Sequence, residues 1–67
     1  MKSNLLKAER IKNGVTQKLI SEKIGITPST YSRKENGLIE FTISELLIVK
    51  SILNLDSTSL YEIFFKN

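Results

Sequence analysis

Apolar residues recur along the chain at the three- and four-residue spacing of an α-helix, in five short segments separated by turn residues. No segment sustains the two-residue alternation that is typical of a β-strand. The pattern therefore predicts an all-α fold, a compact domain of five helices. A length of 67 residues leaves room for one domain, which we place at 1–67 and expect to be only marginally stable.

The boundaries of these helices follow from residues that start or stop a helix. Hydroxyl and carboxylate side chains bind the free amides of the first turn, and glycine supplies the left-handed conformation after the last turn. Thr42 and Glu45 fit a capping box, in which each side chain binds the other residue's amide. The predicted helices run from Ser3 or Asn4 to Asn13, from Gln17 to Ile24, from Thr27 to Asn36, from Thr42 to Leu53, and from Ser59, or one turn earlier from Asp56, to the C-terminal apolar residues.

The connection between the second and third helices is the most informative feature of the chain. Only Gly25 and Ile26 separate the two helices, so they cannot lie antiparallel and must cross steeply, with Ile20 packed against Tyr31. The face of the third helix that points away from Tyr31 is polar, and it consists of Ser29, Ser32, Arg33 and Asn36. A polar face beside an amide-rich helix N-terminus suits the major groove of DNA.

Charge is distributed unevenly along the chain. Residues 1–37 carry eight basic and three acidic side chains, a balance of +5, whereas residues 38–67 carry two basic and four acidic, a balance of −2. One half therefore suits an anionic partner such as double-stranded DNA. Cysteine and histidine are both absent, which argues against a disulfide framework, a transition-metal site and imidazole catalysis.

The composition also limits the class of protein that we expect. No apolar run approaches the ~20 residues of a membrane span, and residues 1–13 are too charged for a signal peptide. The chain has no glycine-rich phosphate loop and few candidate catalytic groups. We therefore expect a cytoplasmic, nucleoid-associated protein that is not an enzyme and needs no cofactor, metal, membrane or small-molecule substrate.

Several residues in the first half of the chain form an ordered set of markers. They are Leu6, Arg10, Val15-Thr16-Gln17, Gly25, Tyr31, Arg33 and Glu35-Asn36-Gly37. With this set the chain, over about residues 3–65, resembles the Cro/repressor-type (xenobiotic-response-element type) helix-turn-helix proteins, the family of lambdoid phage repressors and many small bacterial regulators. The resemblance implies a lambda-repressor-like fold. It also implies a sequence-specific transcription regulator, a repressor of a phage, prophage or mobile element, that binds a palindromic operator as a homodimer.

The resemblance, which places Ser29 and Arg33 at base-reading positions and Gln17 and Asn36 at backbone contacts, is combined with the polar face of the third helix to predict the residues that contact DNA. The base-reading positions are Pro28, Ser29, Ser32 and Arg33. The positions that contact the DNA backbone are Thr16, Gln17, Thr27, Lys34 and Asn36. Arg33 is the strongest of these candidates, because a guanidinium can donate two parallel hydrogen bonds to guanine. Arg10 and Glu35 are expected to pair inside the domain and so to belong to the scaffold.

Three departures from the family pattern change these expectations. Pro28 offers no side-chain donor and suits a thymine methyl group instead. Lys34 replaces an apolar residue, so we expect its stem to pack while its amine reaches a phosphate. The loop 38–41 is apolar and acidic where relatives often carry cations, which predicts weaker binding for each monomer.

The C-terminal residues suggest how a dimer forms. Leu60, Ile63 and Phe64 share one helical face that closes the core, whereas Tyr61 and Phe65 lie on the neighbouring face. Together with Leu55, Tyr61 and Phe65 are predicted to form a self-complementary dimer interface. Phe65 folding back on the core is the alternative to this interface.

A second function remains open at this point. The same fold could serve as a protein-interaction module that binds an antirepressor or toxin-like partner through the apolar loop and Phe64-Phe65. Affinity for DNA falls steeply as salt rises, whereas an apolar protein contact is nearly indifferent to salt. A salt titration therefore separates the two functions.

Overall fold

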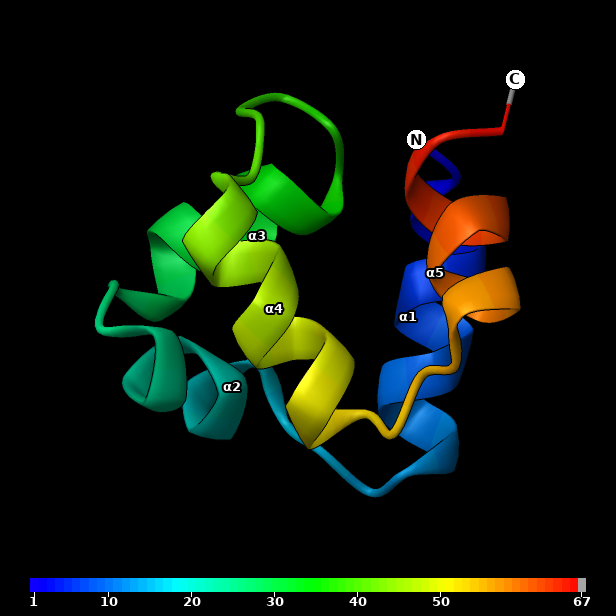
Figure 1. Cartoon of the computed structure of the whole chain (residues 1–67). Coiled ribbons are helices and arrows are strands. Elements are labelled where there is room, and N and C mark those ends of the chain that lie inside the picture. Colours follow the sequence, from blue (N-terminus) through cyan, green and yellow to red (C-terminus); the bar gives the residue numbers. More distant parts are fainter. Residues whose placement is uncertain (67) are drawn as a thin grey trace.

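The computed structural model describes residues 1–66, which form five α-helices joined by short turns (Figure 1). The helices are α1 (Ser3–Lys12), α2 (Gln17–Ile24), α3 (Pro28–Glu35), α4 (Ile43–Ile52) and α5 (Ser57–Phe64). These described residues contain no β-strand, so the predicted all-α class and the predicted order of five helices are confirmed. In Figure 1, α1 and α5 lie side by side, and α2, α3 and α4 form the other part of the domain.

Four of the five helices begin at a side-chain cap, and most of these caps are those predicted. The side chains of Thr16, Thr27, Thr42 and Asp56 each accept the backbone N–H three residues further along. Thr42 also forms the predicted reciprocal capping box with Glu45. The predicted start of the last helix at Ser59 is wrong, because Asp56 accepts the N–H of Ser59 and the helix begins at Ser57.

Helix α1 begins at Ser3, as predicted, but without the predicted cap. Neither Ser3 nor Asn4 caps this helix, which begins at Ser3 after Lys2 and has no side-chain cap. The backbone N–H of Lys2 instead donates to the carbonyl oxygen of Ile63 at 2.7 Å. This bond joins the start of α1 to the last turn of α5, so the two ends of the chain lie close together (Figure 1).

All five helices share one hydrophobic core. Its buried members are Leu6, Val15, Ile20, Tyr31, Val49, Leu53, Leu55 and Ile63. Leu60 and Phe64 of α5 pack against this cluster and are partly buried, as their shared helical face predicts. Each helix has only two or three turns, so burial of its apolar side contributes more to its stability than intrinsic helix propensity does.

The turn between α2 and α3 sets the angle at which these helices cross. Gly25 has φ +90°, a conformation that residues with a Cβ rarely adopt. The N–H groups of Gly25 and Ile26 both bind the carbonyl oxygen of Ser21 and thereby end α2. Thr27 then starts α3 at once, and Ile20 of α2 and Tyr31 of α3 are both fully buried. The two helices therefore form a helix-turn-helix.

Candidate nucleic-acid interface

The third helix has a buried side and an exposed side. Tyr31, Lys34 and Glu35 are buried. The predicted base-reading residues lie on the other side, where Pro28, Ser29 and Arg33 are exposed and Ser32 is half-buried. The predicted backbone-contacting residue Asn36 follows as the exposed C-cap, and its Nδ2 atom lies 3.5 Å from Ser32 Oγ. The structure thus brings the polar residues of α3 together on one accessible face.

The N-terminal ends of α2 and α3 provide the remaining polar groups of this interface. The Thr16 and Thr27 hydroxyls are exposed and accept the N–H groups of Leu19 and Thr30, respectively. Gln17 is half-buried at the first position of α2, and its Nε2 atom donates to Glu35 Oε2 at 2.9 Å. One N–H of the Gln17 amide is used in this bond, which leaves the second N–H for another acceptor.

Glu35 is the centre of a buried hydrogen-bond network. Its carboxylate accepts from Arg10 Nε at 2.7 Å, from Arg10 Nη2 at 3.3 Å, from the Tyr31 hydroxyl at 3.0 Å and from Gln17. Arg10 Nη1 also donates to the Val15 carbonyl oxygen at 3.0 Å. The structure therefore joins Arg10 of α1 to Glu35 at the end of α3, and neither residue faces solvent. Both belong to the scaffold that holds α2 and α3 in place.

The charge states of this network follow from its contacts. Burial alone would raise the pKa of Glu35, but the hydrogen bonds from Arg10, Gln17 and Tyr31 outweigh burial and hold the pKa below its ordinary value. The hydrogen bond to Glu35 raises the pKa of Arg10. Burial, with the nearby carboxylate, raises the pKa of Tyr31 well above its ordinary value. The pair therefore stays ionised at neutral pH.

Lys34 does not occupy the position expected for a phosphate contact. The residue is buried, and its Nζ atom donates to Glu45 Oε1 at 2.6 Å and to the Glu40 carbonyl oxygen at 3.1 Å. The ammonium group also lies 5.9 Å from the centre of the Phe41 ring. Lys34 therefore joins α3 to the following loop and to α4. The predicted contact between Lys34 and the DNA backbone is corrected, because an internal carboxylate already binds the amine.

The predicted dimer interface is also corrected in part. Tyr61 and Phe65 are exposed, as expected. Leu55 is only 5% exposed and belongs to the core. Asn54, at φ +53°, turns the chain after α4, and the Leu55 N–H then binds the Lys50 carbonyl oxygen. This turn directs Leu55 inward, so it cannot join Tyr61 and Phe65 on the surface.

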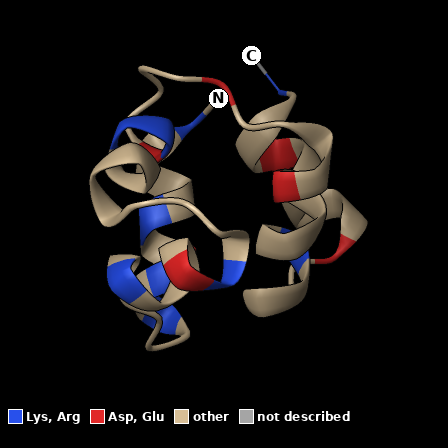
Figure 2. Ribbon diagram, turned by 90° about the vertical axis from the view of Figure 1, so that its left-hand side faces the viewer, with Lys and Arg blue, Asp and Glu red and all other residues tan. Residues whose placement is uncertain are grey.

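Part of the positive charge of residues 1–37 is buried and does not reach the protein surface. Arg10 and Lys34 are both buried in ion pairs. The exposed basic residues of the first half are Lys7, Lys12, Lys18, Lys23 and Arg33. Basic segments gather toward the lower left of the ribbon in Figure 2. Arg33 is therefore the exposed cation that α3 itself offers to a ligand.

Comparison with known proteins identifies the same part of the chain. Residues 6–60 match the model of a family described as helix-turn-helix. The match begins in α1, ends in α5 and includes every residue predicted to contact DNA. No curated protein and no solved structure matches the chain. Among the described residues, every helix is too short or too polar to cross a membrane.

Proposed function

The chain belongs to the Cro/C1-type helix-turn-helix family, whose members are DNA-binding transcription regulators, and from this premise we propose a more specific role. The protein binds a palindromic operator as a homodimer and represses a promoter of a phage, prophage or mobile element. The main support for this proposal is the exposed polar face of α3, which lies beside the capped N-terminus of α2. Such a regulator works in the cytoplasm, at the nucleoid.

In this proposal α3 lies in the major groove. Arg33 is the main base reader, because its exposed guanidinium can bind guanine O6 and N7. Ser29 and Ser32 add short hydrogen bonds to bases, and Pro28 contacts the methyl group of a thymine. The C-terminal turn of α3 then brings Asn36 to the DNA backbone.

The backbone contacts of the proposal come from the two helix N-termini. Thr16 and Thr27 are exposed there, beside free amides that suit a phosphate. Gln17 uses its second N–H to bind a phosphate, while its first N–H stays bound to Glu35. Glu35 thus holds the Gln17 amide in a fixed orientation and lowers the entropy that this contact costs.

Selection of binding sites from random duplex DNA with the purified protein tests this function. We expect enrichment of a palindrome whose half-sites lie about 34 Å apart, one turn of the double helix. Arg33→Ala should weaken specific binding by ~1–3 kcal/mol and relax the preference at one position in each half-site. Gln17→Ala serves as the matched control and should weaken binding to all sequences about equally. An unchanged selected sequence with Arg33→Ala contradicts the assignment of the base-reading face.

A salt titration of the same protein tests the class of partner. Binding to the selected duplex should weaken steeply as salt rises, because phosphate contacts release counterions. If no duplex is enriched, and a protein partner binds with an affinity that salt barely changes, the protein-interaction function replaces this one.

A further inference from the structure

Residues 37–41 form the loop between α3 and the cap of α4, and most of this loop has little packing of its own. Residues 37–40 are all exposed. The last residue of the loop, Phe41, packs inward, and its ring meets the Tyr31 ring edge-on at a centroid distance of 6.1 Å and the Phe64 ring at 5.6 Å. Packing therefore fixes one end of the loop.

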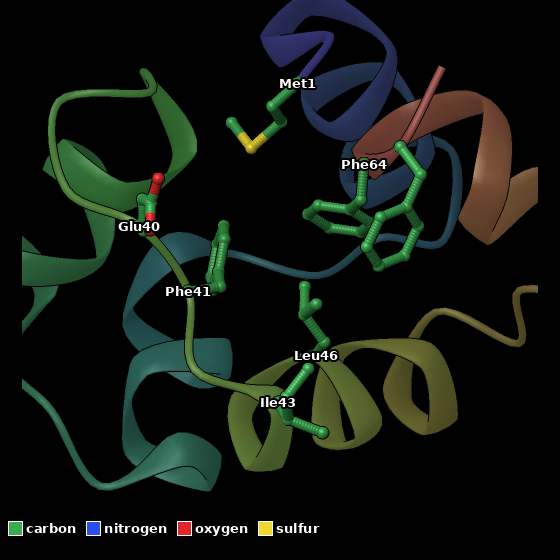
Figure 3. A pocket seen from close by; sticks show the side chains of 7 residues that line it. Met1, Glu40, Phe41, Ile43, Leu46 and Phe64 are labelled. Carbon is green, nitrogen blue, oxygen red and sulfur yellow. The ribbon is translucent and has the colours of Figure 1, made fainter.

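An apolar pocket of about 300 Å³ lies between this loop and the two ends of the chain (Figure 3). In Figure 3, Glu40 and Phe41 lie on one side of the pocket, and Met1 and Phe64 lie on the other. The pocket leaves Glu40 beside open space rather than beside a packed neighbour. Apolar contacts alone therefore do not hold the middle of the loop in place.

Hydrogen bonds hold the start of the loop and reach its middle. The Gly37 N–H binds the Lys34 carbonyl oxygen at 3.1 Å and the Leu38 N–H binds the Arg33 carbonyl oxygen at 2.9 Å, so the last turn of α3 fixes the first two loop residues. Lys34 Nζ donates to the Glu40 carbonyl oxygen at 3.1 Å. Among the described residues, no other side chain binds the backbone of the loop by a hydrogen bond.

The same ammonium group joins the loop to the cap of α4. Lys34 Nζ donates to Glu45 Oε1 at 2.6 Å, and this oxygen also accepts the Thr42 N–H at 2.9 Å. Lys34 is 7% exposed. Burial alone would raise the pKa of Glu45, but the hydrogen bonds from Lys34 and Thr42 hold this pKa below its ordinary value. The ionised pair is thus the point at which α3, the loop and α4 meet.

A buried ion pair of this kind is not required for stability. The cost of removing two charges from water offsets much of their attraction, and apolar residues of similar size often stabilise a fold as well or better. An apolar side chain at position 34 could fill the same space, but it could not donate to the Glu40 carbonyl oxygen. What Lys34 adds is therefore the position of the loop.

We propose that Lys34 is a positioning residue for DNA binding, whose ammonium holds the loop so that the Ile39 and Glu40 N–H groups donate to a phosphate beside Asn36. The inference rests on the proposed function, in which Asn36, directly before the loop, contacts the DNA backbone. Ile39 and Glu40 are exposed, and their N–H groups have no partner within the described part of the chain. A loop that is already held loses less conformational entropy on binding than a mobile loop does.

The Glu40 carboxylate tests whether the loop lies beside a phosphate. Glu40→Gln keeps the backbone carbonyl oxygen that Lys34 binds and removes a negative charge that a nearby phosphate would repel. The variant should strengthen binding to the selected duplex at least about twofold. Glu62→Gln makes the same change in charge on α5 and should have a smaller effect. If Glu40→Gln gains no more affinity than Glu62→Gln, the loop does not border a phosphate and the proposal is overturned.

Replacement of the ion pair separates the position of the loop from the stability of the domain. Lys34→Met with Glu45→Gln removes both charges, and a glutamine can still accept the Thr42 N–H in the capping box. The melting temperature should stay close to that of the wild type. The dissociation constant for the selected duplex should rise roughly tenfold, which corresponds to ordering about one loop residue on binding.

The matched control removes an exposed ion pair on α5. Lys66→Met with Glu62→Gln makes the same change in composition and net charge at a pair whose side chains are 50% and 42% exposed. This control should alter neither the melting temperature nor the dissociation constant. A loss of affinity that is equal in the control and in the Lys34 variant overturns the proposal.

Nitrogen-15 NMR relaxation measures the order of the loop directly. The backbone order parameters of Ile39 and Glu40 should be about 0.85 in the wild type and should fall below about 0.6 in the Lys34→Met/Glu45→Gln variant. Unchanged order parameters in this variant overturn the proposal. A wild-type loop whose order parameters already lie below about 0.6 overturns it as well.

Binding to DNA separates failure of this inference from failure of the proposed function. If the double variant has a mobile loop but binds the duplex as the wild type does, the role of Lys34 is contradicted and the regulator function stands. A weaker dependence of affinity on salt in the double variant also contradicts this role, because Lys34 would then touch a phosphate itself. A wild type that binds no duplex contradicts the regulator function, whereas the relaxation data still show whether Lys34 orders the loop.

Discussion

Removal of the Glu35 carboxylate should destabilise the domain more than any change at its surface. In Glu35→Ala the buried Arg10 guanidinium loses both of its bonds to the carboxylate and keeps only the bond to the Val15 carbonyl oxygen. The Tyr31 hydroxyl and the Gln17 amide lose an acceptor at the same time. The substitution therefore leaves an unpaired buried cation between α1 and α3.

The expected magnitude is large compared with the stability of so short a chain. Breaking a buried ion pair from one side costs ~3–5 kcal/mol. A domain of this length has a total free energy of unfolding of roughly 3–10 kcal/mol. A loss of ~3 kcal/mol lowers the melting temperature by roughly 12–24 °C. Glu35→Ala should thus be partly unfolded near physiological temperature.

Urea and thermal unfolding, followed by circular dichroism, measure this effect. Glu22→Ala is the matched control, because Glu22 is exposed on α2 and should change the free energy of unfolding by less than about 0.5 kcal/mol. The double variant Arg10→Met/Glu35→Leu removes both charges and should recover much of the lost stability. If Glu35→Ala and Glu22→Ala melt at the same temperature, the bonds between Arg10 and Glu35 do not stabilise the domain.

Three further predictions concern the scaffold. The pKa of Glu35 is lower in the folded state than in the unfolded state. The ionised Glu35 carboxylate therefore contributes its full stabilisation of the fold above about pH 4.3, and this contribution is lost as pH falls through the folded pKa. Glu35→Gln should flatten this dependence of the melting temperature on acid pH. Gly25→Ala should lower the free energy of unfolding, measured in urea, by ~1–2 kcal/mol. The loss comes from the φ of +90° alone, because an added Cβ would have no neighbour within 4 Å. Gly25→Asn should lower it less, because asparagine adopts this conformation more readily than alanine. Thr42→Ala should lose ~1 kcal/mol with the capping box of α4, whereas Thr58→Ala, at an exposed position of α5 that caps no helix, should have little effect.

Most helix boundaries could be predicted from the sequence because they depend on contacts within a few residues. Thr16, Thr27 and Thr42 each bind an amide only three residues away. Asp56 and Ser59 were both candidate caps for the last helix, and the structure uses Asp56, the earlier of the two. Local capping patterns therefore give the elements to within a turn.

The burial of Leu55 was missed although the sequence holds a signal for it. After α1, Gly14 turns the chain in a left-handed conformation, and Val15 packs back on the core. Asn54 and Leu55 repeat this order after α4, with asparagine in place of glycine. An apolar residue directly after a left-handed turn commonly contacts the helix that it follows. The pattern could have been recognised at Leu55 because asparagine also adopts this conformation.

The exposure of Ile43 and Leu47 could not be predicted from the sequence. Ile43 and Leu47 look like core residues in an apolar helix, and only the packing of α4 against α2 leaves them exposed. The start of α1 and the last turn of α5 likewise come together through the bond between Lys2 and Ile63. Contacts between residues so far apart in the sequence depend on the whole fold, and helical spacing does not reveal them.

Lys34 gives a last prediction, on how the affinity for DNA depends on salt. Its amine is held by Glu45 and by the Glu40 carbonyl oxygen, so it is not available to neutralise a phosphate. Each cation that neutralises a phosphate adds ~0.9 to the slope of log affinity against log salt. Lys34→Met, combined with Glu45→Gln to avoid an unpaired carboxylate, should therefore leave this slope unchanged. Arg33→Met removes the exposed cation of the same helix, but the proposal assigns this cation to a base and not to a phosphate, so the variant should weaken binding to the selected sequence and change this slope little. A slope that falls by about one in each half-site with the Lys34 variant would mean that Lys34 leaves Glu45 on binding and reaches a phosphate.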